Sequence, residues 1–131
     1  MFNFNGRTPI ELGVTNGKLK SSPDTPNCVN SMDTNKKYYI KPLNAKITVL
    51  KKLLGTMKNV EIISASEKYL YATFKSKFWG FIDDVEFYAN KSPSVLQVRS
   101  ASRIGYSDLG ANRSRIEYIR KELKPDVINE N

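Results

Sequence analysis

The sequence predicts an α+β domain: an antiparallel sheet of four to five strands with two helices packed on one face, preceded by an extended N-terminal arm. Two observations predict this fold. Apolar residues recur every three or four positions over 43–57 and again over 109–123, which is the spacing of one helix face. Between these segments, four runs rich in β-branched and aromatic residues are separated by short turn signals, a pattern typical of an antiparallel meander.

The first 37 residues are punctuated by glycine and proline, so we expect an irregular arm that packs along the domain. A single domain is expected over 38–124, with a polar tail over 125–131. Tyr38–Lys41 is predicted to form a short strand ended by Pro42, a residue that suits the first turn of the next helix. The apolar stripe of that helix consists of Leu43, Ile47, Leu50, Leu54 and Met57.

The expected strands of the meander are Val60–Ala65, Tyr69–Lys75, Gly80–Ala89 and Ser94–Ala101. Strand side chains alternate between two faces, and the last two strands would turn around Lys91-Ser92. The opposed pairs are then Val85–Val98 and Phe87–Leu96 on an apolar face, and Asp84–Arg99 and Glu86–Gln97 on the other. This register matches apolar with apolar residues and opposite charges with each other, and it places Asp83 and Ser100 on the core side.

The last helix is predicted from Leu109 to Leu123, with Asp108 at its N-cap and Pro125 as its stop. Its inward stripe includes Asn112. The chain of 131 residues has the size of one domain, and no apolar run reaches the ~18 residues of a membrane span. The N-terminus does not resemble a secretory signal, so we expect a cytoplasmic protein, with an organellar or processed form as the alternative.

Cys28 is the only cysteine, and the chain has no histidine. This excludes an intramolecular disulfide, zinc sites built from Cys and His, and catalytic Cys-His or Ser-His pairs. We therefore expect no metal and no cofactor. Cys28 itself is expected to be a small buried apolar residue, with a reactive thiol as the alternative.

The net charge is +8, and residues 1–59 carry most of the excess. Four lysines, Lys46, Lys51, Lys52 and Lys58, form a basic face that is a candidate for binding nucleic acid or another anionic surface. Most basic residues of this chain are lysines, however, so such a face also arises without a binding role. Arginine is rarer, and five of the six arginines fall within residues 99–120. Such a cluster suggests bidentate pairing, either with a ligand or within the protein.

The arginine cluster coincides with the predicted last strand, turn and helix start. There we expect a polar cluster that either binds a ligand or serves as a structural lock: Asp83, Arg99, Ser100, Ser102, Arg103, Ser107, Asp108, Asn112 and Arg113. An inward Asp83 must be paired, and we expect its partners in the turn over 100–108. Asp83 and Asp84 are weak candidates for acid–base catalysis.

Four blocks of the sequence, in order, resemble a known family. They are Leu12-Gly13, 22–31 (SPDTPNCVNS), 80–87 (GFIDDVEF) and 99–113 (RSASRIGYSDLGANR). The chain resembles the uncharacterised bacterial and plastid family called domain of unknown function family 1499. The resemblance implies a fold and shared positions but no activity. That family usually has Cys-Pro where this chain has Ser22-Pro23, and the single remaining cysteine suits a reducing compartment.

The sequence thus favours a non-enzymatic binding or assembly module that uses the arginine-rich strand–turn–helix site. We expect a protein partner. Two alternatives stay open at this point: a small-molecule-binding enzyme with a carboxylate and arginine pocket, and a binder of nucleic acid or an anionic surface through the lysines.

Overall fold

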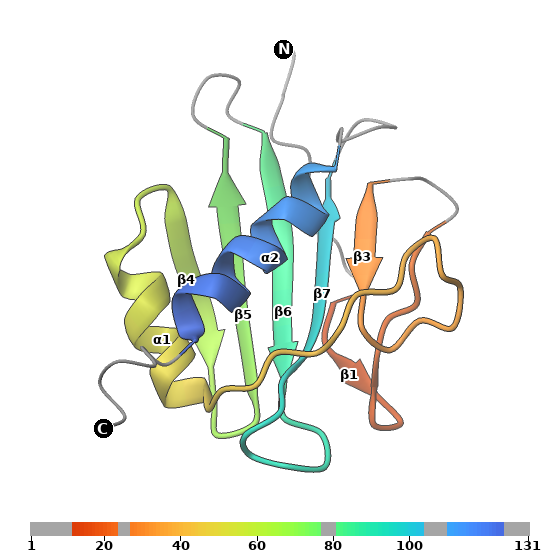
Figure 1. Ribbon diagram of the computed structural model, residues 1–131, viewed down its shortest axis with the longest axis horizontal. Coiled ribbons are helices and arrows are strands. Elements are labelled where there is room, and N and C mark those ends of the chain that lie inside the picture. The colour runs from red at the N-terminus through yellow and green to blue at the C-terminus, as the bar shows by residue number, and fades with distance from the viewer. Residues whose placement is uncertain (1–11, 24–26, 77–80, 104–109, 125–131) are drawn as a thin grey trace.

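The computed structural model describes residues 12–23, 27–76, 81–103 and 110–124. Its main sheet has five antiparallel strands in the order β3-β7-β6-β5-β4, and both helices lie against one face of it (Figure 1). The strands are β3 (Cys28–Asn30), β4 (Val60–Ala65), β5 (Tyr69–Lys75), β6 (Ile82–Tyr88) and β7 (Gln97–Ser102), and the helices are α1 (Ile47–Thr56) and α2 (Ala111–Leu123). A separate small hairpin consists of β1 (Val14–Thr15) and β2 (Lys18–Leu19).

This architecture confirms the α+β fold class. The bounds of β4 and β5 match the prediction, and β6 and β7 lie within the third and fourth predicted regions, with β7 ending one residue later. The N-terminal region is less irregular than expected, because it contributes β1, β2 and an edge strand of the main sheet. β3 pairs with β7, with Val29 opposite Ser100. Three residues are too short for a periodic signal, so the sequence did not reveal this strand.

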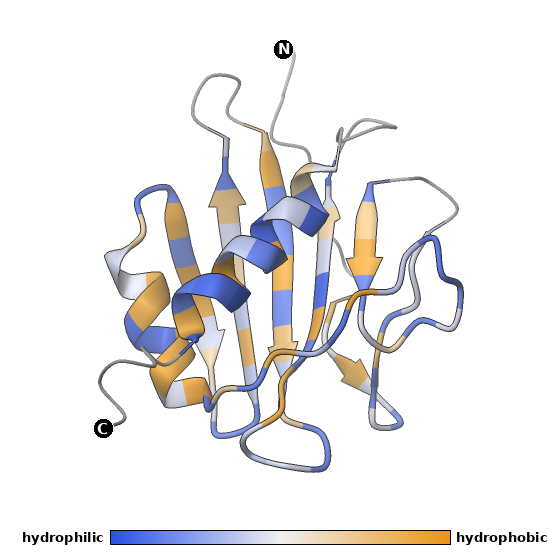
Figure 2. Ribbon diagram, in the orientation of Figure 1, coloured by the Kyte–Doolittle hydropathy of each residue, from blue (hydrophilic) through white to orange (hydrophobic). Residues whose placement is uncertain are grey.

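The hydrophobic core lies between the sheet and the two helices. Leu50 and Leu54 of α1 and Ile116 and Ile119 of α2 are almost completely buried in it. They pack on apolar residues of the facing strands: Leu70, Ala72, Phe74, Val85, Phe87 and Val98. Figure 2 shows apolar and polar residues alternating along the strands, as a sheet with two different faces requires.

The prediction for the start of α1 was wrong. The helix begins at Ile47 after Lys46, and Pro42 lies outside it. Leu43 is fully buried, but it forms an isolated antiparallel bridge with Leu96 instead of joining the helix stripe. The predicted strand over Tyr38–Lys41 is also absent, since only Tyr39 of that segment forms a bridge.

The predicted register between β6 and β7 was wrong by two residues. Glu86 lies opposite Arg99, and Phe87 lies opposite Val98. The reason is Leu96, which exchanges backbone hydrogen bonds with Leu43 and so leaves the β6–β7 ladder (Leu43 N to Leu96 O, 2.9 Å; Leu96 N to Leu43 O, 2.7 Å). A shift of two residues keeps every side chain on its predicted face, because the side-chain period of a strand is two.

Helix α2 begins at Ala111, later than predicted, and its N-cap position is Gly110 with φ of 80°. A left-handed backbone of this kind suits glycine. Asp108, the predicted N-cap, and Leu109 lie outside the described residues. No helix in the described part of the chain is long and apolar enough to cross a membrane.

Candidate functional site

The face of the sheet opposite the helices carries two rows of polar side chains. Each row combines a tyrosine from β5, a carboxylate from β6 and an arginine that belongs to or directly follows β7. The rows are Tyr71–Asp84–Arg103 and Tyr69–Glu86–Arg99. In both, the tyrosine reaches the carboxylate diagonally, since Tyr71 lies directly opposite Glu86 in the ladder and Tyr69 opposite Tyr88.

In the first row, both carboxylate oxygens of Asp84 accept hydrogen bonds. Tyr71 donates its hydroxyl to Oδ1 at 2.5 Å. Arg103 donates Nε to Oδ2 at 2.9 Å and Nη2 to Oδ1 at 3.0 Å, a bidentate arrangement. Burial and the carboxylate of Asp84 raise the pKa of Tyr71 to about 12, so this hydroxyl stays protonated at neutral pH.

In the second row, the carboxylate of Glu86 is completely buried but only half satisfied. Its Oε2 accepts hydrogen bonds from the Tyr69 hydroxyl at 2.5 Å and from the backbone N–H of Gly13 at 2.6 Å. Its Oε1 is buried without a hydrogen-bond partner, and Arg99 Nη1 lies 3.9 Å from it. Burial raises the pKa of Glu86, and the Tyr69 and Gly13 hydrogen bonds and the charge of Arg99 oppose this rise.

The second row also holds the N-terminal segment 12–22 against the sheet. Arg99 donates Nε to the backbone oxygen of Lys20 at 3.0 Å and Nη2 to that of Ser21 at 3.4 Å. Asn30 of β3 donates its amide to the same Lys20 oxygen at 2.7 Å. Together with the Gly13–Glu86 bond, these contacts recognise backbone groups, so they anchor the segment without depending on its side chains.

On the helix-covered face, a second polar cluster joins β7 to α2. Asn112 is fully buried; its Oδ1 accepts from the Ser100 hydroxyl at 2.5 Å, and its amide donates to Ser102 Oγ at 2.8 Å and to Asn27 O at 3.1 Å. Asp83 also faces the helix, as the alternation predicted, but its partner is Arg115 of α2, at 2.7 Å. Residues 104–108 of the turn in which we expected its partners lie outside the described residues, so that expectation stays a prediction.

The predicted strand–turn–helix cluster is thus divided between two faces of the sheet. Ser100, Ser102 and Asn112 come together beside the pair Asp83–Arg115, whereas Arg99, Arg103 and Asp84 lie on the other face. Arg113 takes part in neither group and donates to the backbone oxygens of Tyr39 and Lys37. Ser107 and Asp108 lie outside the described residues.

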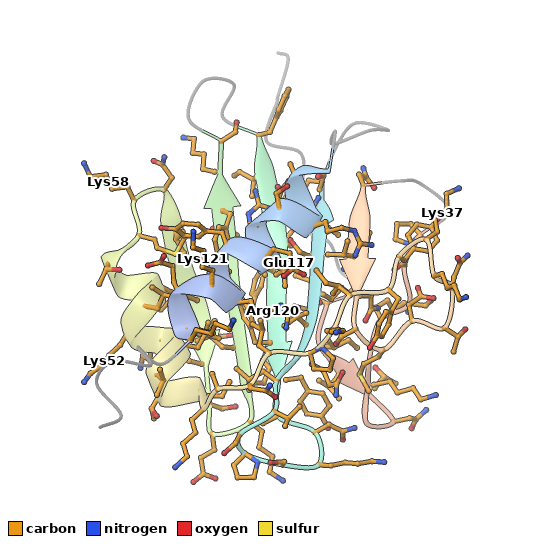
Figure 3. The ribbon with its side chains drawn as sticks, in the orientation of Figure 1. Lys37, Lys52, Lys58, Glu117, Arg120 and Lys121 are labelled. Carbon is orange, nitrogen blue, oxygen red and sulfur yellow. The ribbon has the colours of Figure 1, made fainter. Side chains whose placement is uncertain are left out.

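Cys28 is buried, and its Sγ lies 3.4 Å from Ser22 Oγ. The four lysines of the predicted basic face are all exposed on and around α1, and Figure 3 labels two of them, Lys52 and Lys58. Within the described ranges, no group of three or more His, Cys, Asp or Glu residues could hold a metal ion.

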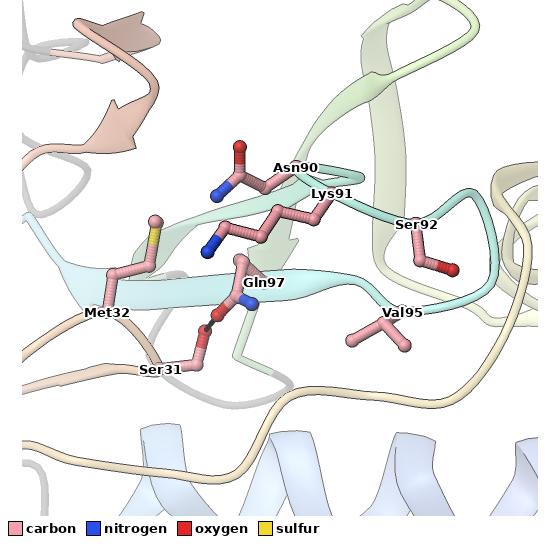
Figure 4. A pocket seen from close by; sticks show the side chains of 7 residues that line it. All are labelled: Ser31, Met32, Asn90, Lys91, Ser92, Val95 and Gln97. Carbon is pink, nitrogen blue, oxygen red and sulfur yellow. Dashed lines mark hydrogen bonds between the residues drawn. The ribbon is translucent and has the colours of Figure 1, made fainter.

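A pocket of about 420 Å³ lies beside the β6–β7 hairpin (Figure 4). We call it the hairpin pocket; its lining residues are Ser31, Met32, Asn90, Lys91, Ser92, Val95 and Gln97. Ser31 Oγ accepts from Val98 N at 2.7 Å and donates to Gln97 Oε1 at 2.7 Å. In Figure 4, the Lys91 side chain extends over Gln97 toward Met32.

Sequence reasoning missed this pocket and both tyrosines of the polar rows. Lys91 and Ser92 were interpreted only as turn residues, because nothing in the sequence shows that β3 brings Ser31 beside them. The tyrosines did carry a signal: Tyr69 and Tyr71 share one strand face, as do Asp84 and Glu86, so a polar second face of the sheet was predictable from period two.

The comparisons with known proteins identify a family and no activity. The model of the family described as "Protein of unknown function (DUF1499)" matches residues 18–123, most of the chain. No curated protein and no solved structure matches at a significant level.

Proposed function

The chain belongs to the DUF1499 family, whose function is unknown, and we propose that it is a non-enzymatic binding module whose ligand site is the hairpin pocket. One observation carries the proposal. Three side chains that line this pocket, Asn90, Lys91 and Gln97, bear hydrogen-bond donors without a partner among the described residues. Polar groups that converge on a cavity in this way are the usual mark of a small-molecule site.

The orientation of the Gln97 amide supports the proposal. Ser31 Oγ accepts the Val98 N–H, so its single hydroxyl proton is free to be donated, and it goes to Oε1 of Gln97. Because this bond uses Oε1, the amide nitrogen Nε2 of Gln97 remains available to donate hydrogen bonds to a ligand in the pocket. Gln97 is therefore a positioned donor rather than a freely rotating side chain.

The arginine-rich strand–turn–helix site predicted from the sequence is a weaker candidate for ligand binding than the hairpin pocket. Arg99, Arg103, Arg113 and Arg115 each donate to groups within the protein, so a ligand would have to compete for donors already in use. Arg120 likewise binds Glu117 and the backbone oxygens of 41–42, and Figure 3 labels this ion pair on α2. We infer that these arginines are structural: Arg115 joins α2 to Asp83 of β6, whereas Arg99 and Arg103 stabilise the opposite face of the sheet.

The placement of the carboxylates supports a non-enzymatic role. Asp83 and Asp84 face opposite sides of the sheet, and each forms an ion pair with an arginine. They cannot share one substrate as the two members of an acid–base pair, which is what the enzymatic alternative needs.

The test is an NMR titration of the ¹⁵N-labelled full chain with a panel of small acids, amines, sugars and nucleosides. Binding in the hairpin pocket is expected to shift the amide signals of residues 31–32 and 90–97. Val95→Phe, which narrows the pocket, should weaken those shifts, and Tyr118→Phe on the exposed face of α2 is the matched control. Shifts confined to 99–113, or turnover of any panel compound, would overturn the proposal.

A second candidate is binding of nucleic acid or another anionic surface through Lys46, Lys51, Lys52 and Lys58. It is favoured by the exposure of all four on one helix and its flanks. Retention on heparin that falls steeply between about 50 and 200 mM salt, as phosphate-dominated binding does, would support it. Four Lys→Gln substitutions should then abolish the retention. We also propose a reducing compartment such as the cytoplasm, because the sequence contains a single cysteine.

A further inference from the structure

We infer that the hairpin pocket binds a carboxylate group, with the ammonium of Lys91 as its counter-charge and the amides of Asn90 and Gln97 as additional donors. This inference rests on the proposed function, since it names the ligand class of the same pocket.

The free groups of the pocket are mainly donors. Two of its acceptors are used within the protein, since Gln97 Oε1 receives the Ser31 hydroxyl and Ser92 Oγ receives the backbone N–H of Ser94. The amide of Asn90 offers one acceptor oxygen and two donors. The ammonium of Lys91 has three N–H bonds and the Gln97 amide has two, and none of these has a partner in the described part of the chain. A ligand that satisfies them must therefore be rich in acceptors.

The charge of the pocket favours a monoanion. Lys91 is the one charged side chain among the lining residues that the structure describes, so a ligand with a single negative charge neutralises this part of the pocket. A phosphate dianion would leave a charge without a counter-charge, and the described lining residues include no guanidinium fork of the kind that binds phosphate bidentately. A carboxylate fits both conditions.

The rest of the wall suits a short apolar stem. Val95 and Met32 are half-buried and line the same pocket as the donors, and in Figure 4 the Met32 thioether lies near the end of the Lys91 side chain. A methionine adapts to stems of different shape because its side chain is unbranched. The ligand is thus a carboxylate on a few aliphatic carbons, and either a free acid or the C-terminus of a polypeptide supplies this chemistry.

The experiment compares five probes on the ¹⁵N-labelled full chain at low ionic strength: butyrate, its neutral isostere butyramide, inorganic phosphate, and a pentapeptide ending in valine in two forms, the free acid and the C-terminal amide. Butyrate is expected to shift the amide signals of residues 31–32 and 90–97. It should also bind at least about tenfold more tightly than butyramide, because only butyrate can form charge-assisted hydrogen bonds with Lys91. Free-acid peptide that binds more tightly than butyrate identifies a polypeptide C-terminus as the source; equal or weaker binding identifies a free acid.

Lys91→Met keeps the aliphatic stem of the side chain and removes the charge. It should weaken butyrate about tenfold and leave butyramide unchanged. Lys121→Met, at an exposed lysine of α2, is the matched control and should change neither. Both variants change exposed residues, and a thermal melt checks that each folds.

Two results separate the failure of this inference from that of the proposed function. If butyramide or phosphate binds the pocket as well as butyrate does, the carboxylate assignment is wrong while the pocket remains a binding site. If none of the five probes and no compound of the wider panel shifts residues 31–32 and 90–97, the proposed function itself fails, and this inference with it.

Discussion

Glu86 and Arg99 lie directly opposite each other on β6 and β7, yet the nearest charged atoms, Oε1 and Nη1, are 3.9 Å apart. The arginine turns its Nε and Nη2 to the backbone of Lys20 and Ser21 instead. A fully buried carboxylate without a close counter-ion is costly in its charged form, and this is why burial raises the pKa of Glu86.

The first prediction concerns the pH dependence of stability. Because the pKa of Glu86 is higher in the folded chain than the usual 4.5, its contribution is fully present below about pH 4.5 and is lost as the pH rises through the raised value. Glu86→Gln does not titrate, so the stability of wild type relative to this variant should fall with rising pH, by at most about 1.4 kcal/mol per pH unit. Urea unfolding at several pH values between 4 and 8 measures this difference. Parallel profiles for the two proteins would contradict the prediction.

The second prediction concerns the buried pair Asp84–Arg103. Their side chains are only 1% and 8% exposed, so removing one partner leaves the other charge buried and should cost about 3–5 kcal/mol. A double-mutant cycle with Asp84→Ala and Arg103→Ala should give a coupling free energy of about 2 kcal/mol. The matched control is the more exposed pair Glu117–Arg120 on α2, for which the same cycle should give about 0.5 kcal/mol or less. Equal coupling in both cycles would show that burial does not strengthen the pair.

The third prediction tests the lock between β7 and α2. Asn112 Nδ2 donates to Asn27 O, and Asn112 Oδ1 accepts from Ser100 Oγ and from Arg115 Nη1. The Asn112→Asp variant keeps an acceptor beside Arg115 but loses the amide donors, so Asn27 O should be left facing a carboxylate. We expect this variant to lose about 3 kcal/mol of stability at neutral pH and to recover part of the loss in acid, where the new carboxyl is protonated. Chemical denaturation at pH 4 and pH 7 measures both effects. A pH-independent loss would mean that packing, rather than hydrogen bonding, makes Asn112 important.

The fourth prediction uses the contact between Ser22 and Cys28. Since Ser22 Oγ lies 3.4 Å from Cys28 Sγ, a Ser22→Cys variant should form a disulfide under oxidising conditions. The short loop that it closes is expected to add about 2 kcal/mol of stability relative to the reduced variant. Titration of free thiols and melting curves with and without reductant provide the measurement. If the thiols stay free in oxidant, segment 12–22 does not lie against β3 as described.

Local sequence patterns predicted the fold class, the bounds of β4 and β5 and the face of every residue on β6 and β7. They could do so because the side-chain periods of strands (two residues) and helices (3.6 residues) are visible within short stretches of sequence. What failed depends on distant residues. The register shift follows from the bridge between Leu43 and Leu96, and the ion pair between Asp83 and Arg115, which was not predicted, joins residues 32 positions apart. The hairpin pocket was hidden for the same reason, since Ser31 reaches it only through the pairing of β3 with β7.

The pairing of β3 with β7 also has a consequence for the order of events during synthesis. Cys28 pairs with Ala101, 73 positions further along the chain. At typical translation speeds, roughly 4–15 seconds separate the appearance of the two residues, while β4, β5 and β6 can already pair with their neighbours. β3 therefore stays unpaired until β7 has been synthesised. The hairpin pocket forms late as well, because it needs residues 31–32 and residues 90–97 together.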